Sequence, residues 1–465
     1  MIKLKNYIAI VILIFSWFAL YWITGSKTPW TEFNNASNDG GIRVHLGDVP
    51  ASNYDRMGFT KGVVRHIQSE DAWLVGTERG ELFLFNNKGK QLWKRSLGIG
   101  KLISLCISND GTIAYVGEAS PEGNLYAIDI TSGDVLWKCK ASDYVGSETS
   151  KRSHPSIVHI VVDKDDNVYA NAYRFLMTET GKRAYNAKML ALSKKGKMLW
   201  QFPKKEGMDS WINWCDVNDA NNSVVIATSA YDFRDKMRYK DTLYFLDKVS
   251  GENINSIFVE PIVPFNNTVM RGSPNFSKDG KYLAAACSDG RGILFDGSGN
   301  VLWQRFVSKP TQIDGVWINA SGRDGFVIGV SVLFTTINTF NKENWQLPTP
   351  LNHPSSNSLF AFNLNGSFKY QFRTEGTIEE IDFADGLVAC AIGRNVRTHN
   401  YAAHGALIID LQEGKQKNFY RTEGPCQAIA ISDDGSKMAG IEAPALTPQG
   451  KVLGAYRLHI WDLEK

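Results

Sequence analysis

The chain has 465 residues, of which 43% are hydrophobic and 12% aromatic, and it contains 41 Gly. This length exceeds the usual size of a single hydrophobic core, so the chain forms either several domains or one repeat architecture. The formal net charge is only +3, and a charge this close to balance argues against a nucleic-acid-binding protein.

The N-terminal segment differs from the rest of the chain. Residues 7–24 carry no charge and follow Lys3 and Lys5, and a run of this length is near the minimum that spans a bilayer as a helix. We therefore predict a membrane anchor at residues 1–24. A cleaved signal peptide stays open as an alternative, although its apolar core is usually shorter and no small-x-small cleavage site follows. Because only Lys27 closely follows the helix, we expect the N-terminus in the cytoplasm and the remaining chain outside it.

Six cysteines are present, and none forms a CxxC, a CxxCH or an adjacent pair. That spacing excludes the usual haem attachment and clustered zinc sites. Most of them fall inside apolar strand patterns, where a buried free thiol behaves as a small hydrophobe. Disulfides between neighbouring strands stay open as an alternative.

One short pattern recurs along the chain: an apolar strand, a polar turn with Gly, and a strand that carries Trp four residues after the Gly. The copies are LFLFNNKGKQLW (82–93), LYAIDITSGDVLW (125–137), LALSKKGKMLW (190–200) and ILFDGSGNVLW (293–303). An alternating strand with a turn rich in Asp, Asn and Gly precedes the copies, as in ISNDG (107–111) and FSKDG (276–280). These residues tolerate the left-handed backbone of tight hairpins, so each repeat contains four strands.

We count eight such units from 63–96 to 425–462, the sixth of them at 311–372. Four-stranded units at this spacing, without helical periodicity between them, indicate a propeller. The predicted fold class is therefore all-β: an eight-bladed β-propeller of four-stranded antiparallel blades at 42–465, preceded by one transmembrane helix. The Trp residues expected to pack an outermost strand against the next blade are Trp93, Trp137, Trp200 and Trp303.

The last unit ends without a partner strand, which would leave an unpaired edge. The alternating run IRVHLGD (42–48) is predicted to pair with residues 456–462 and so close the ring. Residues 25–41, which are rich in Asn, Ser and Gly, are predicted to be the tether between the anchor and the ring.

The segment AIDITSGDVLW resembles the repeat of the quinoprotein-like, or PQQ-like, propellers, whose pattern is Ala-x-Asp-x-x-Thr-Gly-x-x-x-Trp. Ala127, Asp129, Gly133 and Trp137 match this pattern, and Ser132 replaces the Thr. The resemblance implies an eight-bladed ring. It does not imply one activity, because the family includes pyrroloquinoline quinone dehydrogenases, an outer-membrane assembly lipoprotein and sensor domains.

The dehydrogenase branch of that family is known for a disulfide between adjacent cysteines and a bound Ca²⁺, and this chain has no Cys-Cys pair. The resemblance is therefore to the non-dehydrogenase branch, in the style of membrane-tethered envelope propellers. The sequence also lacks GxSxG, Walker and HExxH motifs. We predict no enzymatic activity, no cofactor, no metal site and no catalytic residue. Glu379, Glu380 and Asp382 are interpreted as solvated or channel-lining acids.

Several connections between the second and third strands of a unit are long, whereas the other turns within the units are short. In a propeller these two classes lie at opposite ends of the ring, and long loops on a rigid scaffold are usually functional. The alternative is that the insertions have no function. Candidate binding residues on these connections are Arg234, Arg238, Tyr239, Trp345, Arg394, Arg397, His399, Tyr401 and His404.

From these patterns we predict a membrane-anchored, extracytoplasmic scaffold that mediates protein-protein interactions in an envelope complex. The alternative is a propeller that binds or senses a small molecule or glycan at the mouth of the channel, where Trp211, Trp214 and Trp317 would stack on sugar rings. A quinone-dependent dehydrogenase is the third reading.

Overall fold

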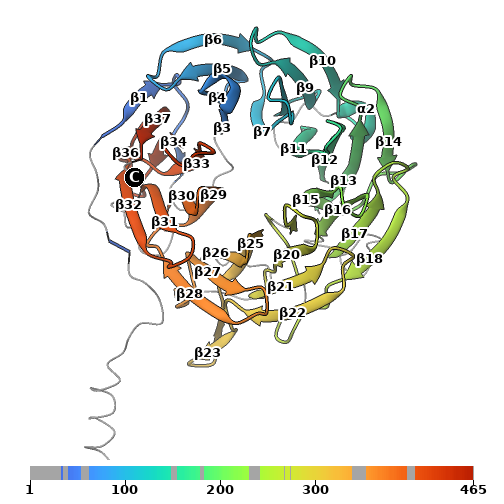
Figure 1. The fold of residues 1–465 in the computed structure, drawn as a ribbon, viewed down its shortest axis with the longest axis vertical. Helices are drawn as coiled ribbons and strands as arrows, with labels where there is room; N and C mark the ends of the chain where they lie inside the picture. The colour runs from blue at the N-terminus through green and yellow to red at the C-terminus, as the bar shows by residue number, and fades with distance from the viewer. Residues whose placement is uncertain are drawn as a thin grey trace, which may run out of the picture.

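In the computed structural model the strands form a ring around a central channel (Figure 1). The described residues are 33–34, 40–53, 62–147, 154–177, 183–229, 241–265, 268–272, 274–337, 352–394 and 404–463. The predicted anchor and most of the tether lie outside them. No helix within these ranges is long and apolar enough to cross a membrane.

Four-stranded antiparallel blades make up the ring. In chain order the first strands are β3 (Gly62–Ile67), β4 (Ala72–Thr77), β5 (Glu81–Asn86), β6 (Gln91–Ser96), β7 (Lys101–Ile107), β8 (Ile113–Ala119), β9 (Asn124–Asp129) and β10 (Val135–Lys140). The next are β11 (Ser156–Val162), β12 (Val168–Met177), β13 (Arg183–Leu192), β14 (Met198–Phe202), β15 (Trp211–Asn218), β16 (Ser223–Ser229), β17 (Thr242–Asp247) and β18 (Asn253–Phe258).

The chain continues through β19 (Asn275–Phe276), β20 (Tyr282–Ala286), β21 (Arg291–Asp296), β22 (Val301–Phe306), β25 (Ser321–Ile328), β26 (Ser331–Ile337), β27 (Ser358–Asn363) and β28 (Phe368–Arg373). It then forms β29 (Ile378–Ala384), β30 (Leu387–Ile392), β31 (Gly405–Asp410), β32 (Gln416–Arg421), β33 (Cys426–Ile431), β34 (Lys437–Glu442) and β37 (Arg457–Asp462). The described blades form six four-stranded sheets and one eight-stranded sheet, in which β7–β10 and β11–β14 are joined by the pair Ser156 and Ala119.

The hydrophobic core lies between neighbouring blades rather than within one sheet. Val63 and Leu74 of the first blade, for example, form one buried cluster with Leu105 and Val116 of the next. Similar clusters fill the other junctions, including the one between the last blade and the first. Each blade therefore buries its two apolar faces only because it has neighbours on both sides.

The recurring Gly and Trp pack against each other across these junctions. The indole nitrogen of Trp200 donates to the backbone oxygen of Lys248 in the next blade at 2.9 Å. Its ring covers Gly251, where a Cβ atom would lie 2.5 Å from the indole and where φ is +69°, a backbone that favours Gly. The copies at 125–137 and 190–200 thus each supply a Trp that packs on the next blade and a Gly that is covered by the Trp of the preceding blade. The pairs are Trp93 with Gly133, Trp137 with Gly196, Trp200 with Gly251 and Trp303 with Gly366.

Strand β1 (Ile42–His45) completes the last blade by pairing with β37, from Ile42 opposite Ile460 to His45 opposite Arg457. Ile42 and Val44 pack against the core cluster shared with the first blade. They also lie over Gly89. The equivalent Gly at several other junctions is covered by a Trp. The N-terminal segment therefore closes the ring noncovalently.

The sixth blade begins later than the sequence pattern predicts. Its first strand is Ser321–Ile328, whereas residues 311–318 form a separate hairpin of β23 (Thr311–Ile313) and β24 (Val316–Ile318). The left-handed backbone of Asp314 and Gly315 makes this tight turn. An insertion between two blades had the same alternating pattern as a blade strand, so its period alone did not separate the two.

Candidate binding surfaces

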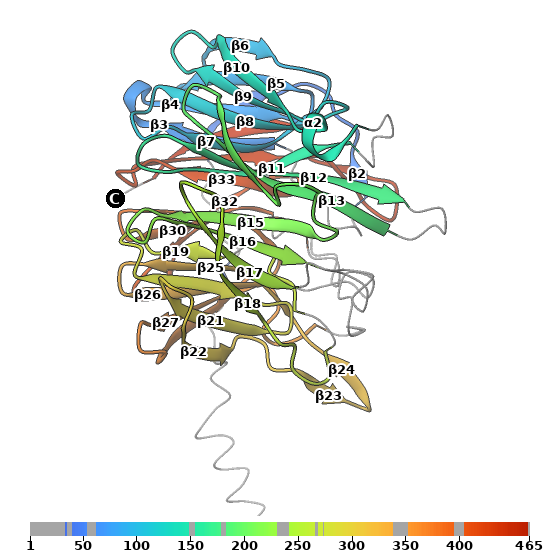
Figure 2. The ribbon, with the colours of Figure 1, turned by 90° about the vertical axis from the view of Figure 1, so that its right-hand side faces the viewer.

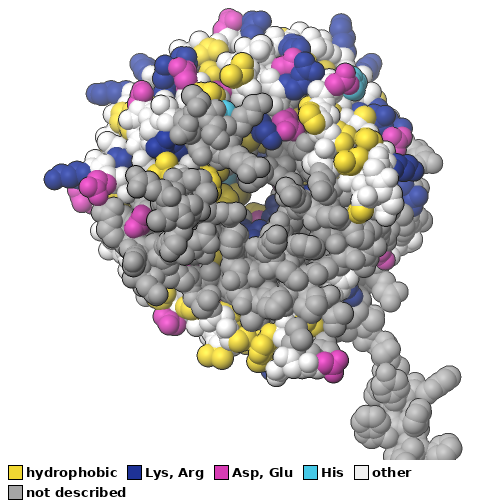
Figure 3. Space-filling model, turned by 180° about the vertical axis from the view of Figure 1, so that it is seen from behind, with side chains coloured by type: hydrophobic (Ala, Val, Ile, Leu, Met, Phe, Trp, Pro, Cys, Tyr) yellow, Lys and Arg dark blue, Asp and Glu magenta, His cyan; other side chains and the backbone are white. Residues whose placement is uncertain are grey.

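The two ends of the ring differ in how much structure they carry. We use "elaborated face" for the end with the connections between second and third strands and between blades, and "short-turn face" for the other end. Figure 2 shows the extra elements projecting on one side, and Figure 3 views that side from the front, with an opening at its centre.

Every described element outside the blades' strands and short turns belongs to the elaborated face. A short helix, α2 (Ser142–Val145), packs on the long β12–β13 hairpin, where the Arg174 Nε atom donates to the backbone oxygen of Val145 at 3.0 Å. The β23–β24 hairpin projects there as well (Figure 2). A small three-stranded sheet joins β2 (Ser52–Asn53), β35 (Ala445–Leu446) and β36 (Val452–Leu453).

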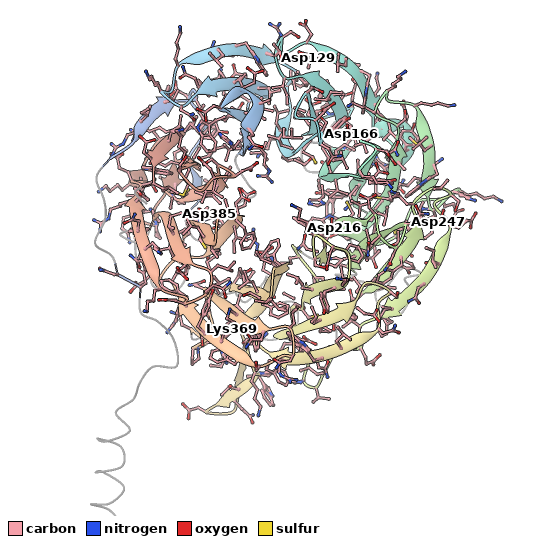
Figure 4. All side chains as sticks on the ribbon, viewed as in Figure 1. Asp129, Asp166, Asp216, Asp247, Lys369 and Asp385 are labelled. Carbon is pink, nitrogen blue, oxygen red and sulfur yellow. The ribbon has the colours of Figure 1, made fainter. Side chains whose placement is uncertain are left out.

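On the short-turn face, turns of adjacent blades bond to each other. The Asn109 side chain donates to the backbone oxygen of Asp163 and to Asp166 Oδ1 in the next blade, at 2.7 and 2.8 Å. Lys194 forms ion pairs with Asp110 and Asp166 at 2.7 and 2.8 Å. Several polar groups of this face are therefore bonded within the ring. Figure 4 labels Asp166 and Asp385 in turns of this face, Asp129 and Asp247 at the strand ends that lead into such turns, and Lys369 on the outer strand β28.

The channel wall is built by polar side chains that bridge one innermost strand to the next. An innermost strand has no sheet partner on its channel side, so its backbone groups need other partners. The Oδ2 atom of Asp216, at the inner wall in Figure 4, accepts the backbone N–H of Phe276 at 2.6 Å. Further bridges join Arg323 to Ile378 (2.8 Å), Glu380 to Ile429 (3.0 Å) and Asp382 to Ile431 (3.0 Å).

The pKa values of two of these wall carboxyls are raised. Burial raises the pKa of Asp216 to about 7, and burial, opposed by the charge of Arg65, raises the pKa of Asp382 to about 6. Burial also lowers the pKa of His159 to about 3, so this imidazole is neutral at physiological pH. The wall therefore holds groups whose charge is costly where they sit.

These shifts predict a pH dependence of stability. An Asp in the unfolded chain titrates near pH 4, so between about pH 4 and 7 Asp216 is protonated to a greater extent in the native state than in the unfolded state. The contribution of Asp216 to the free energy of unfolding should therefore fall as the pH rises through this window, whereas the buried His159 and His404 contribute in the opposite direction. Relative to the unchanged protein, Asp216→Asn should therefore gain roughly 1–3 kcal/mol in the free energy of unfolding between pH 5 and 7.5, measured by denaturant titration.

The matched control is Asp385→Asn, an exposed turn residue, whose pH dependence should equal that of the unchanged protein. An Asp216→Asn variant whose stability changes with pH in the same way as that of the unchanged protein would contradict the assignment.

Most of the binding residues predicted from the sequence lie outside the described residues. These are Arg234, Arg238, Tyr239, Trp345, Arg397, His399 and Tyr401. The two that are described differ from the expectation of an exposed loop, because the Arg394 and His404 residues are 1% and 0% exposed.

The backbone at Arg394 and His404 fixes the two ends of the connection to the sheet. The backbone oxygen of Arg394 accepts from Thr377, and that of His404 from Thr422, at 3.0 and 3.1 Å. Burial lowers the pKa of His404 to about 4. Both side chains therefore lie beneath the surface, and their contact with a partner stays a prediction.

The tryptophans proposed to stack on sugars do not share one site. Trp214 stacks on His159 with ring centroids 3.6 Å apart and donates to Asn275 at 2.9 Å, which makes it part of the channel wall. Trp211 packs against Tyr173 at 5.3 Å, beside the β12–β13 hairpin. Trp317 is on β24, whose hairpin projects from the outer part of the ring (Figures 1 and 2).

One apolar feature of the elaborated face was not predicted from the sequence. Leu446 on β35 and Val452 on β36 are cross-strand neighbours, and 38% and 54% of their surfaces are exposed. Exposed apolar residues on a rigid hairpin are typical of interface anchors. The only sequence signal was an apolar residue on each side of the turn TPQG (447–450).

All six cysteines are free thiols, four of them buried. Burial, opposed by Arg65, raises the pKa of Cys106 to about 11, so this thiol is an unreactive packing group. Within the described ranges, no group of His, Cys, Asp and Glu has the arrangement of a metal site.

Four-stranded antiparallel blades around a channel define a β-propeller. The family described as outer membrane protein assembly factor BamB matches residues 29–234. The crystal structure of BamB from Moraxella catarrhalis is similar over 91% of this chain and 100% of its own, with a TM-score of 0.53 and 13% identity. The chain is thus a β-propeller that is similar, over residues 29–234, to the PQQ-like propellers of the BamB type.

A second solved structure, the β-propeller domain of Cps50 (Swd1) from Myceliophteria thermophila, has a TM-score of 0.46 and 10% identity, covering 91% of this chain and 100% of that one. No curated protein matches the sequence.

Proposed function

We propose that this protein is a membrane-anchored, extracytoplasmic scaffold that binds protein partners of an envelope complex through the elaborated face of an eight-bladed ring. The six four-stranded sheets, together with the two halves of the eight-stranded sheet, support the proposed count of eight blades. The anchor is residues 7–24, with the N-terminus in the cytoplasm. We assign the protein no catalytic role.

The observation that carries this proposal is the difference between the two faces. The short-turn face uses its side chains in bonds between blades, such as those of Asn109 and Lys194. The elaborated face holds a helix, two added hairpins and the exposed pair Leu446 and Val452. A rigid scaffold that places added elements on one face is the usual arrangement of a binding protein.

The similarity to BamB also supports a role in binding other proteins. The matching family is described as an assembly factor for outer membrane proteins, which is a role carried out by binding other proteins. The glycan alternative has less support, because Trp214 and Trp317 lie in different parts of the ring.

The test compares the two faces in the full-length protein. Leu446→Asp with Val452→Asp, and separately Arg238→Ala with Tyr239→Ala, should reduce the partners that co-purify from detergent-solubilised membranes at least fivefold. Anchors at an interface are often worth 2 kcal/mol or more, whereas exposed substitutions change stability by only about 0.5 kcal/mol.

Lys88→Ala, Lys195→Ala and Lys278→Ala, which are exposed on the short turns, are the matched controls and should retain the partners. If these controls lose the partners and the elaborated-face variants retain them, binding occurs on the short-turn face and the proposal is overturned.

A further inference from the structure

The outermost strands of the blades share a charge bias that the whole chain does not have. Within their described bounds these strands contain Lys and Arg but no Asp or Glu. The innermost strands instead carry several acids, including Asp216, Glu380 and Asp382. A nearly neutral chain has therefore placed cations on the outer rim of the ring.

The rim is not uniform. On one side of the ring, β14 and β18 hold no charged residue. On β6 and β10 the cations are paired with acids, as in Lys94 with Glu81 at 2.5 Å and Lys140 with Glu122 at 2.5 Å. These parts of the rim carry little net charge.

The arc formed by β28, β32 and β1 carries Lys or Arg on each of its three strands, and it lies opposite β14 and β18 in Figure 1. Its cationic residues are Arg43, Lys369, Arg373, Lys417 and Arg421. Lys369 donates to the neutral side-chain oxygens of Ser331 and Gln412, both at 2.9 Å, and Lys417 forms an ion pair with Asp410 at 3.6 Å. Phe368 on the same arc is 53% exposed.

The N-terminal segment joins the ring at this same arc. Phe33 packs edge-on against Phe419 of β32, with centroids 4.9 Å apart. Asn34 exchanges two hydrogen bonds with the Gln416 side chain, at 3.0 and 2.8 Å. Since a residue extends the chain by at most about 3.4 Å, residues 25–32 span no more than roughly 30 Å. A membrane that holds residues 7–24 is therefore within reach of this arc.

We propose that the arc of β28, β32 and β1 docks on the anionic headgroups of the membrane that holds the anchor, so that the ring stands on its edge. The inference rests on the membrane anchor of the proposed function. Basic side chains next to an anchor and an exposed aromatic residue are the chemistry that binds anionic lipid. In this orientation the elaborated face points sideways along the membrane and stays open to partners.

The test is lysine acylation of the full-length protein in nanodiscs, read by mass spectrometry. In phosphatidylglycerol nanodiscs Lys417 should react at least threefold more slowly than in phosphatidylcholine nanodiscs. Lys195, which is exposed on a short turn of the β11–β14 blade, should react equally in both. In Arg43→Glu with Arg421→Glu, the protection of Lys417 should disappear.

Equal slowing of Lys195 and Lys417, equal reactivity of Lys417 in the two lipids, or protection that survives the double variant would each overturn the docking. A chain that is retained by both nanodiscs but leaves Lys417 unprotected refutes only this inference. A chain that is not retained by either refutes the anchor as well.

Discussion

Replacing Ile42 and Val44 together by Asp is expected to lower the free energy of unfolding by about 3 kcal/mol or more. Both side chains pack against the cluster between the last and first blades and lie over Gly89. Burying an apolar side chain of this size is worth roughly 1.5–3 kcal/mol, and a carboxylate in its place adds a desolvation cost. The loss should appear in a denaturant titration followed by circular dichroism.

Arg43→Asp is the matched control, because Arg43 is on the same strand and exposed. It should change stability by only about 0.5 kcal/mol. A chain that begins at residue 55 should likewise melt at a lower temperature than one that begins at residue 28. Equal stability of the double Asp variant and the control would show that β1 does not close the ring.

The second large effect is expected at Trp200, where Ala should cost about 3–5 kcal/mol, the usual range for a buried large aromatic. The residue is 6% exposed, its ring covers Gly251, and its indole nitrogen bonds to Lys248 of the next blade. Trp200→Phe keeps most of the buried area and loses the hydrogen bond, so it should lower the free energy of unfolding by only about 1 kcal/mol.

Leu199→Ala provides the comparison, since the adjacent Leu199 is 44% exposed. Its cost should stay below about 1 kcal/mol. If Trp200→Ala is as stable as Leu199→Ala but loses a binding activity, then the indole is a ligand contact rather than a packing group.

The repeat made much of the fold predictable. Gly and Trp at a fixed spacing indicate a unit that packs on its own copies, and Trp93, Trp137, Trp200 and Trp303 each contact the following blade. The all-β propeller class follows from that pattern. The hairpin at 311–318 could not be separated from a blade strand, because an insertion can alternate in the same way.

The binding surface was less predictable for a physical reason. Loop length indicates a face, but it does not say which side chains point outward, and Arg394 and His404 are polar residues that the structure buries. The bridges of the channel wall could not be predicted from the sequence either, because Asp216 and Glu380 bond to backbone groups of the next blade. Nearly every residue offers the same backbone groups, so the residue type at a position does not show that its backbone is the partner.

The most direct test of the central claim is photocross-linking from single positions on the two faces in intact cells. A photoreactive amino acid at Val452 or Gln312, both exposed on the elaborated face, should form adducts with protein partners. The same amino acid at Lys88 or Lys278 on the short turns should form none. Adducts from Lys88 and Lys278 alone would contradict the account, because they would place the partner on the face where the turns are bonded to each other.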